Sequence, residues 1–346
     1  MWNEIKTRHL LRLPASERSG PIGDTVITTF NVENLLDLAT NPLAGGWDER
    51  GVMTPERIEM KLTKLALAIR LELRRPEIII IQEAGSTGIL QNLANRVNAA
   101  VSTAYMATSC KTSDKRGLEV GFLWDSSRVE LLEVSQLCGP DVESAFGLSS
   151  PSPGREPLIG IFKTKGKRLT IVGVHFKSML GDDPVSGTNG PIVSVTEIQR
   201  KAQARVVRNF VNSILDHDPQ ALLMVAGDLN DCQFVRSDGN GDRNGDGSAD
   251  GRTDYPVAIL EGGPGEVPLT NLITLREKKD GTFTFIHDIR AQMLDHMLVS
   301  PALLKLFVAV DILHFNAGFP LDLSEDTSTT RRASDHDPLE GRFNFK

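Results

Sequence analysis

Polar side chains that can bind a cation or transfer a proton follow six short apolar runs of this sequence. Carboxylate and amide oxygens are the ligands that a hard divalent cation prefers, and histidine is the commonest residue in proton transfer. Each residue taken alone has an ordinary explanation, because Asn, Asp and Glu are frequent in the turns after strands. Strand ends that converge at one sheet edge are where sites are built, so as a set they predict one. They are Asn31 and Glu33 in FNVEN, Glu83 in IIQEAG, His175, Lys177 and Ser178 in VHFKS, Asp228 and Asn230 in GDLND, Asp295 in LDH, and Asp335 and His336 in SDHDP.

Two pairs in this set have a spacing that suits work on a phosphate. Asp228 and Asn230 stand two apart, so on an extended segment they point to the same side. A carboxylate able to orient or deprotonate water then lies beside an amide that donates to a phosphate oxygen. Lys177 alternates with His175 in the same way and can add a cation to that phosphate site.

Apolar runs that are typical of buried strands recur along the chain and alternate with helical patterns. The runs lie at 26–30, 77–83, 118–124, 168–176, 221–229 and 293–300, and the helical patterns begin at Thr54 and Thr196. Each helix opens on a Thr, with a Glu in its first turn, which is typical of a capped N-terminus. The mixture predicts an α/β fold. The run 118–124 followed by the run near Val129 predicts a hairpin, so the sheets should not be purely parallel.

The ordered motifs resemble those of the endonuclease/exonuclease/phosphatase superfamily. Its members include pancreatic-type deoxyribonuclease, apurinic endonucleases, neutral sphingomyelinases and inositol polyphosphate 5-phosphatases. The resemblance runs from about Val26 to Pro338, and it is greatest to bacterial nuclease-like proteins with FNVENL, HFKS and SDHDP motifs. It implies a four-layered α/β sandwich, in which two packed, mainly antiparallel or mixed β-sheets are flanked by helices.

The same resemblance implies a metal site for Mg²⁺ or Mn²⁺. Glu83 would be the principal ligand, with Asn31 and Asp335 in or near its coordination shell. Glu33 would contribute as well, although some relatives carry the shorter Asp at this position.

It also implies the acid–base residues. His336 would contact the scissile phosphate or transfer a proton, and Asp295 would fix its tautomer and favour its protonated form. His175 would contact the phosphate or protonate the leaving oxygen, with a buried structural histidine as the alternative. Many relatives place an aromatic residue where this chain has His296, for which we expect a role in packing or hydrogen bonding.

The expected reaction is in-line attack of water on phosphorus, without a covalent enzyme intermediate. The leading hypothesis is an endonuclease acting on DNA or RNA. The alternatives are a phosphatase or phosphodiesterase acting on inositol phosphates or a lipid headgroup, as in the sphingomyelinases, and a binding scaffold without catalysis. Acyl transfer and nucleoside-triphosphate chemistry find no support, because no GxSxG or GxxxxGK[ST] motif is present.

Two loops rich in Gly, Asp, Asn and Ser interrupt the pattern, at 181–196 and 237–254. In the second loop, acidic and amide residues alternate as in calcium-binding loops, with Gly247 at the sharp turn. We expect a structural Ca²⁺ there, with a plain polar loop as the alternative; no acidic residue completes an EF-hand. The candidate ligands are Asp238, Asn240, Asp242, Asn244, Asp246 and Asp250.

Basic residues recur along the second helix, and for most of them we expect a solvated face with Glu197 as a counter-charge. Arg200 is the exception to test as a phosphate contact, because it follows the 181–196 loop. The other basic residues are Lys201, Arg205 and Arg208. Trp124 is expected in the core.

Composition sets broad limits on the protein class. The 346 residues, 40% of them hydrophobic, suffice for a large core, and we expect an arm at 1–24 and a single domain at 25–346. A net charge of −7 argues against a protein that wraps nucleic acid through a broad basic surface. Three separated cysteines indicate neither a zinc site nor a disulfide framework. We expect no transmembrane segment and no secretory leader within this chain. The compartment and the oligomeric state stay open.

Overall fold

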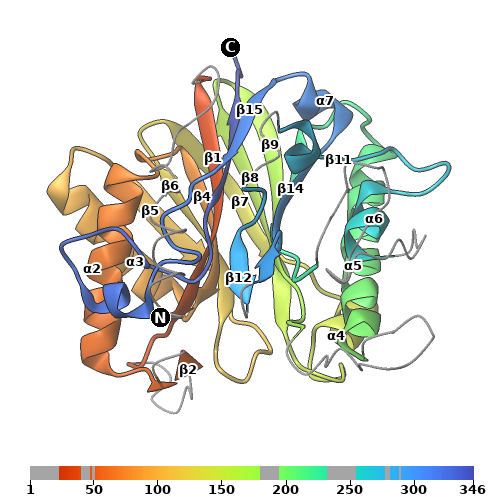
Figure 1. Cartoon of the computed structure of the whole chain (residues 1–346). Coiled ribbons are helices and arrows are strands. Elements are labelled where there is room, and N and C mark those ends of the chain that lie inside the picture. Colours follow the sequence, from red (N-terminus) through yellow and green to blue (C-terminus); the bar gives the residue numbers. More distant parts are fainter. Residues whose placement is uncertain are drawn as a thin grey trace.

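Two six-stranded mixed β-sheets pack face to face, and helices cover the outer face of each sheet (Figure 1). The computed structural model describes residues 23–39, 47–48, 51–179, 195–231, 255–276, 281–287 and 290–346. The layers follow the order helices, sheet, sheet, helices. This arrangement confirms the expected four-layered α/β sandwich.

In the first sheet, two parallel strands occupy the centre, and antiparallel strands extend it on both sides. Its order is β15 (Phe307–Ile312), β16 (Leu339–Phe343), β1 (Thr25–Leu35), β4 (Ile78–Ala84), β6 (Glu119–Asp125) and β5 (Tyr105–Ser109). The pair β1 and β4 is parallel, with Ile27 beside Ile78.

The second sheet repeats this plan around the parallel pair β9 and β10. Its order is β11 (Thr270–Asn271), β14 (Asp295–Val299), β10 (Leu223–Asp228), β9 (Lys167–His175), β8 (Arg155–Thr164) and β7 (Val129–Gln136). Two small hairpins complete the strands of the described part: β2 (Trp47–Asp48) with β3 (Gly51–Val52), and β12 (Phe285–His287) with β13 (Arg290–Gln292).

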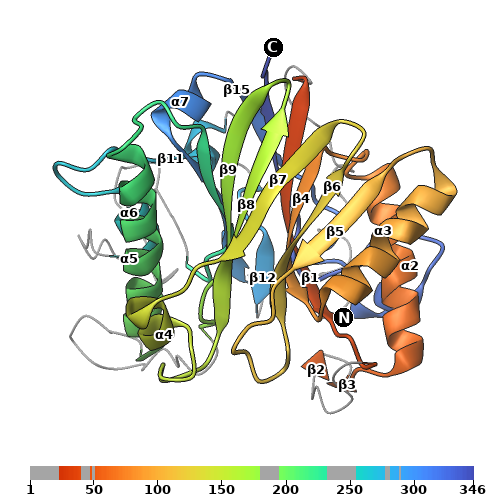
Figure 2. The ribbon, with the colours of Figure 1, turned by 180° about the vertical axis from the view of Figure 1, so that it is seen from behind.

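Helices α2 and α3 lie on the first sheet, whereas α4, α5 and α6 lie on the second, as both views show (Figures 1 and 2). Their bounds are α2 Pro55–Leu71, α3 Thr87–Ala100, α4 Pro140–Ala145, α5 Val195–Leu215 and α6 Pro256–Glu261. The short helices are α7 (Pro301–Leu304) and two 3-10 turns, η1 (Leu272–Leu275) and η2 (Leu321–Glu325). No helix in the described part of the chain is both long enough and apolar enough to cross a membrane.

The start of α2 follows from its sequence. The Thr54 hydroxyl accepts a hydrogen bond from the backbone N–H of Arg57 at 3.4 Å, which satisfies one donor of the first turn. Pro55 occupies the first helical turn, where its missing N–H costs nothing. The predicted helix at Thr54 is confirmed. The second predicted helix begins at Val195, one residue before Thr196.

Apolar side chains fill the space between the sheets. Ile80, Phe122 and Phe162 are fully buried there, and the two Phe rings meet edge to face with centroids 5.3 Å apart. Strand β4 is buried on both faces, against α2 and α3 on one side and the other sheet on the opposite side. Burial on both faces explains why its sequence is a continuous apolar run and not an alternating one.

The predicted hairpin between 118–124 and the run near Val129 is wrong. Strand β6 pairs with β4 and β5 in the first sheet, whereas β7 pairs with β8 in the second. Asp125 organises the short crossing, because its carboxylate accepts from Ser127 and from Arg128 Nε. Arg128 in turn forms an ion pair with Glu77. The chain therefore changes sheets at a turn where hairpin pairing was expected.

The two pairs of parallel strands determine where the predicted site lies. Strands β1, β4, β9 and β10 all end at the same end of the sandwich, and β14 begins there with Asp295 opposite Asp228. The polar residues at these strand ends therefore meet where the two sheets come together. The arm at 1–24 except its last two residues, most of 181–196 and the whole loop 237–254 lie outside the described residues, so these assignments stay predictions.

We predict that Gly227→Ala destabilises the fold severely. Its φ is +151°, and an added Cβ would lie 1.9 Å from the Val174 carbonyl oxygen, so the central parallel pair would have to separate. We expect a loss of about 3 kcal/mol in the free energy of unfolding, measured by urea denaturation. Gly166→Ala is the matched control, because its φ is +81° with nothing within 4 Å. It should cost about 1 kcal/mol from backbone strain alone. Equal losses in both variants would contradict the steric argument.

Candidate active site

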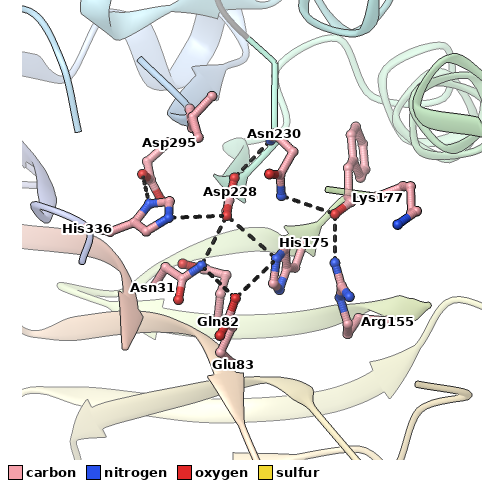
Figure 3. Close-up of polar contacts among 12 residues, drawn as sticks. Asn31, Gln82, Glu83, Arg155, His175, Lys177, Asp228, Asn230, Asp295 and His336 are labelled. Carbon is pink, nitrogen blue, oxygen red and sulfur yellow. Dashed lines mark hydrogen bonds and ion pairs between the residues drawn. The ribbon is translucent and has the colours of Figure 1, made fainter. Parts of the chain in front are cut away.

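Seven of the predicted residues form one buried polar cluster at the end of the sandwich (Figure 3). They are Asn31, Glu83, His175, Asp228, Asn230, Asp295 and His336. The two histidines lie on opposite sides of Asp228 in this view. Asn31 and Glu83 come from the first sheet, whereas His175, Asp228 and Asp295 come from the second. The cluster therefore exists only when both sheets are packed.

The Asn31 amide joins the two sheets. Its Nδ2 donates to Glu83 Oε1 at 3.3 Å and to Asp228 Oδ2 at 3.0 Å. Its Oδ1 accepts from the backbone N–H of Glu33 at 3.0 Å. Asn31 is therefore held on three sides, and it aligns carboxylates that come from different sheets.

Several residues of the site have a left-handed backbone. The φ angles are 53° at Glu33, 50° at Asn34, 66° at Glu83 and 46° at Asn230. Such angles are uncommon outside Gly, and a Glu gains nothing from them locally. At Glu83 the conformation accompanies a side chain whose Oε2 accepts from Asn34 N at 2.8 Å. The tertiary structure therefore imposes backbone strain where the carboxylates must be aimed.

His336 is held by a carboxylate. Its Nδ1–H donates to Asp295 Oδ2 at 2.7 Å, so Nε2 faces Asp228 Oδ2, 3.8 Å away. Burial lowers the pKa of His336, but the carboxylates of Asp295, Asp228 and Asp335 outweigh it and hold the pKa well above its usual value. The Phe285 ring packs on the imidazole, with centroids 4.8 Å apart. His336 is therefore a fixed and protonated imidazole in the absence of a bound cation.

Burial raises the pKa of two neighbouring aspartates, whereas it lowers the pKa of the histidine. It raises the pKa of Asp228 to about 7, against the favourable charge of His336. It raises the pKa of Asp335 to about 6, and the neighbouring Glu33 carboxylate adds to the rise. The backbone N–H of Asn230, which donates to Asp228 Oδ1 at 2.8 Å, lowers the pKa of Asp228 and offsets part of this rise. Burial is thus the main reason why both carboxyl groups hold a proton more readily than they would in water.

His175 is the uncharged histidine of the pair. Only 2% of it is exposed, and its Nε2 lies 3.5 Å from Asp228 Oδ2 and 3.8 Å from Glu83 Oε1. Burial lowers its pKa well below the usual value, and the charges of Arg155 and Arg116 lower it further. One histidine of the site is therefore protonated and the other neutral, which is the division that acid–base work requires.

A cation fits this donor set. Within the described part of the chain, Asp228, Asp295 and His336 offer ligand atoms that all lie within 4.8 Å of one another, so this group can hold a metal ion. However, the Nδ1–H of His336 already donates to Asp295, which suits proton transfer better than ligation. Glu83 and Asp335 are the other candidate ligands, and the charge of Glu83 contributes to the raised pKa of Asp335.

The remaining predicted residues lie around the cluster. Lys177 donates through its backbone N–H to Gln203 Oε1 at 2.8 Å, and its carbonyl accepts from Arg200 Nη1 at 3.2 Å. Arg200 is 3% exposed and also donates to Thr196 Oγ1. Phosphate contacts by Lys177 and Arg200 stay predictions, as does the calcium loop, which lies outside the described residues. His296 is fully buried and bonded to Asn271 and to the Asp231 carbonyl, as expected for packing.

The expected solvated basic face of the second helix is partly wrong. Arg208 is 2% exposed, and it donates to the carbonyls of Leu260 and Val267 at 3.0 and 2.6 Å. The helix buries this face against α6 and the segment after it, so the guanidinium satisfies backbone carbonyls there. Lys201 does pair with Glu197 at 3.0 Å, and Arg205 is exposed, as predicted. Trp124 lies in the core, also as predicted.

Residues 26–310 match the family model described as Endonuclease/Exonuclease/phosphatase family. The chain belongs to the endonuclease/exonuclease/phosphatase family. This is a family of phosphoester hydrolases, so the expected superfamily is confirmed. A comparison with curated proteins gives no match.

Solved structures of this fold cover most of the chain. A humanized D. rerio TDP2 has a TM-score of 0.57 at 18% identity, over 92% of this chain and 98% of that one. D. rerio TDP2 complexed with a single-strand DNA product gives 0.55 at 19% identity, with the same coverage of 92% and 98%. A Bacteroides thetaiotaomicron mannosyl-6-phosphatase gives 0.57 at 13% identity, over 93% and 100%. At these identities the likeness shows the shared fold.

Sequence reasoning missed three cations near this family's motifs. Lys61 on α2 is 5% exposed, and its Nζ lies 3.1 Å from Glu33 Oε2. Arg155 Nη2 donates to the carbonyl of Phe176, between His175 and Lys177. Arg116 Nη1 donates to Asn34 Oδ1 at 3.3 Å. Of these three, only Lys61 could have been found from the sequence, because a lysine on the apolar face of a helix needs a buried partner.

We predict that Asp295→Asn lowers the pKa of His336. The substitution removes the nearest negative charge while keeping a hydrogen-bond acceptor for Nδ1, so burial then dominates. A pH titration of the imidazole nitrogens by NMR measures the change. Asp322→Asn, an exposed aspartate in η2, is the control and should leave His336 unchanged. An unaltered His336 pKa in Asp295→Asn would contradict the assignment.

We predict that Lys61→Met costs about 3–5 kcal/mol of stability, because it leaves the Glu33 carboxylate buried without its partner. Thermal or urea unfolding measures the loss. The double variant Lys61→Met with Glu33→Gln should regain most of it. Arg96→Met, which breaks an exposed pair with Glu59, is the control and should cost under about 1 kcal/mol. A double variant no more stable than Lys61→Met would argue against the pairing.

Proposed function

We propose that this protein is a divalent-metal-dependent phosphodiesterase, and that it cleaves DNA or RNA as an endonuclease by in-line attack of water. The observation that carries the proposal is the buried cluster in which Asn31 joins Glu83 and Asp228 across the two sheets. Its carboxylates and its two unlike histidines provide the metal ligands, the base and the acid that phosphoester hydrolysis needs.

Glu83, Asp335 and Asn31 are the proposed ligands of Mg²⁺ or Mn²⁺, with Glu33 as a further contributor. These oxygen donors suit a hard cation, which prefers carboxylate and amide oxygens as ligands. Once bound, the cation would polarise the phosphate and neutralise charge developing in the transition state. Lys61 restrains one oxygen of Glu33 and thereby orients the carboxylate.

Asp228 is the proposed group that orients and deprotonates the attacking water. Its pKa of about 7 lies close to neutral pH, where a general base works efficiently. Asn230 is the proposed amide donor to a phosphate oxygen, although its Nδ2 donates to the Phe176 carbonyl at 3.2 Å in this structure. The substrate phosphate would therefore compete with that carbonyl.

The two histidines divide the remaining work. Protonated His336, held by Asp295, donates from Nε2 to the scissile phosphate and stabilises its growing negative charge. Neutral His175 contacts the phosphate on the other side of Asp228, and because its lowered pKa leaves it unprotonated, the proton for the leaving oxygen comes from His336. No covalent bond between enzyme and phosphorus forms in this scheme, so rate enhancement comes from positioning and electrostatics.

The comparisons favour nucleic acid and one other substrate class. The similar D. rerio TDP2 is complexed with single-strand DNA product, which supports a polynucleotide substrate. The similar mannosyl-6-phosphatase supports a second candidate, a phosphatase of a phosphorylated small molecule. Inositol phosphates and lipid headgroups belong to the same test. A binding scaffold without catalysis is disfavoured, because the acids and both histidines are assembled.

We predict that Glu83→Gln and His336→Ala each lower turnover by about 100-fold or more, in proteins that still unfold cooperatively above the assay temperature. Plasmid DNA, structured RNA and bis-nitrophenyl phosphate are incubated with Mg²⁺, Mn²⁺, Ca²⁺ or EDTA. Cleavage should require the metal and disappear with EDTA. Glu130→Gln, on the exposed edge of β7, is the control and should keep full activity.

Two outcomes would redirect the proposal. Inert polymers with a cleaved reporter would keep the phosphodiesterase chemistry and favour a small or lipid substrate. Near-normal turnover in both Glu83→Gln and His336→Ala would refute the site assignment.

A further inference from the structure

A cationic loop borders the cluster on the side of His175. The loop spans residues 112–117, between β5 and β6, and it contains Asp114, Lys115 and Arg116. Arg116 Nη1 donates to Asn34 Oδ1 at 3.3 Å, and the N–H of Asn34 donates to the Glu83 carboxylate. One residue therefore separates Arg116 from the proposed metal ligand. Its charge also contributes to lowering the pKa of His175, which is consistent with this closeness.

The loop is rigidly built. Asp114 accepts from the backbone N–H of Arg116 at 2.8 Å, and Thr112 Oγ1 donates to the Leu118 carbonyl at 2.6 Å. Glu156 holds Ser113 through both its N–H and its hydroxyl. A loop fixed in this way presents its cations without a large ordering cost when a ligand binds.

Asp114 joins two arginines that have different exposures. Its carboxylate lies 3.0 Å from Arg155 Nη1 and 3.7 Å from Arg116 Nε. The Arg155 side chain is 7% exposed and supports the Phe176 carbonyl, whereas the Arg116 side chain is 40% exposed. In Figure 3, Arg155 lies beyond His175, on the side away from His336. The Asp114 carboxylate is shared by two guanidinium groups, and Lys115 lies next to Arg116 in the chain, so cationic side chains gather on this side of the site.

We propose that Arg116, fixed by Asp114 and Asn34, binds a second phosphate of the substrate, the one next to the scissile phosphate in a polynucleotide strand. This inference rests on the proposed function. It adds that the site recognises a phosphate beside the one that reacts. Arginine suits this role, because its planar guanidinium group can present two parallel N–H donors to the oxygens of a phosphate. The half-exposed position at the rim suits a strand that continues out of the site, since a small substrate would end within it.

A pair of dinucleotides that differ by one phosphate isolates this contact. Thymidylyl-thymidine is compared with the same dinucleotide carrying a terminal phosphate, at the 5′ end in one arm and the 3′ end in another. Cleavage of the internucleotide bond is followed by chromatography, with the full-length protein and saturating metal. In the wild type, one of the two terminal phosphates should raise kcat/KM by about tenfold, the effect of one charge-assisted hydrogen bond.

We predict that this gain falls below about twofold in Arg116→Met and is partly restored in Arg116→Lys, which keeps the charge but loses the planar donors. Lys163→Met is the matched control. It removes one positive charge at the far end of β8 from Arg155, where Lys163 pairs with exposed Glu130, and it should keep the gain. Unchanged melting curves exclude unfolding as the cause.

The outcomes separate this inference from the proposed function. If the wild type cleaves the dinucleotides and the gain is the same in Arg116→Met, or neither terminal phosphate produces a gain, the inference is overturned while the phosphodiesterase assignment stands. If the wild type cleaves neither dinucleotide nor bis-nitrophenyl phosphate, the proposed function fails first. A last outcome concerns small substrates. If the second phosphate of an inositol bisphosphate raises kcat/KM in the wild type but not in Arg116→Met, and the dinucleotides show no such gain, the polynucleotide assignment is wrong.

Discussion

Negative charge held in a buried seam between two sheets is the constraint on which this structure depends. Glu83 and Asp228 come from different sheets, and they approach closely enough for one Asn31 amide to donate to both. Burial opposes ionisation of such groups, which explains the raised pKa values of Asp228 and Asp335. The energetic cost of the site is therefore the cost of keeping these carboxylates away from water.

The fold tolerates this cost because the layers around the seam are strongly apolar. Each fully buried aliphatic or aromatic side chain contributes about 1.5–3 kcal/mol, and the clusters on both faces of each sheet contain many of them. Left-handed angles at Glu33, Glu83 and Asn230 cost about 1 kcal/mol each. They lie at or just beyond the ends of the parallel strands, where packing on both sides leaves the backbone little freedom. Strain is therefore stored at the positions where side chains must be aimed.

The two sides of the site differ in chemistry. On one side, His336 stacks against Phe285 and is held by Asp295, in an apolar and acidic setting. On the other side, burial lowers the pKa of His175, and the charges of nearby Arg155 and Arg116 lower it further. Identical residue types thus acquire opposite protonation states from their neighbours. The same asymmetry gives the site a cationic flank, although the chain as a whole is acidic.

The sequence by itself determined the fold family and most members of the cluster. Apolar runs indicated the strands, and polar residues directly after them indicated the site, because strand ends at one sheet edge meet whatever the loops do. The FNVEN, GDLND and SDHDP motifs carried enough spacing information to name Asn31, Asp228 and His336. The sequence did not determine the crossing after β6, because a short polar turn fits a hairpin and a change of sheet equally well.

Only the tertiary structure decided which cations serve the site. Lys61, Arg116 and Arg155 lie far from the motifs in sequence, and each reaches its partner through packing between elements. Arg208, expected in solvent, is buried because α6 and the segment after it cover that face of its helix. Local sequence patterns indicate which segments form strands and helices. The partner of a long charged side chain depends on distances between elements, and these are set by how the layers pack.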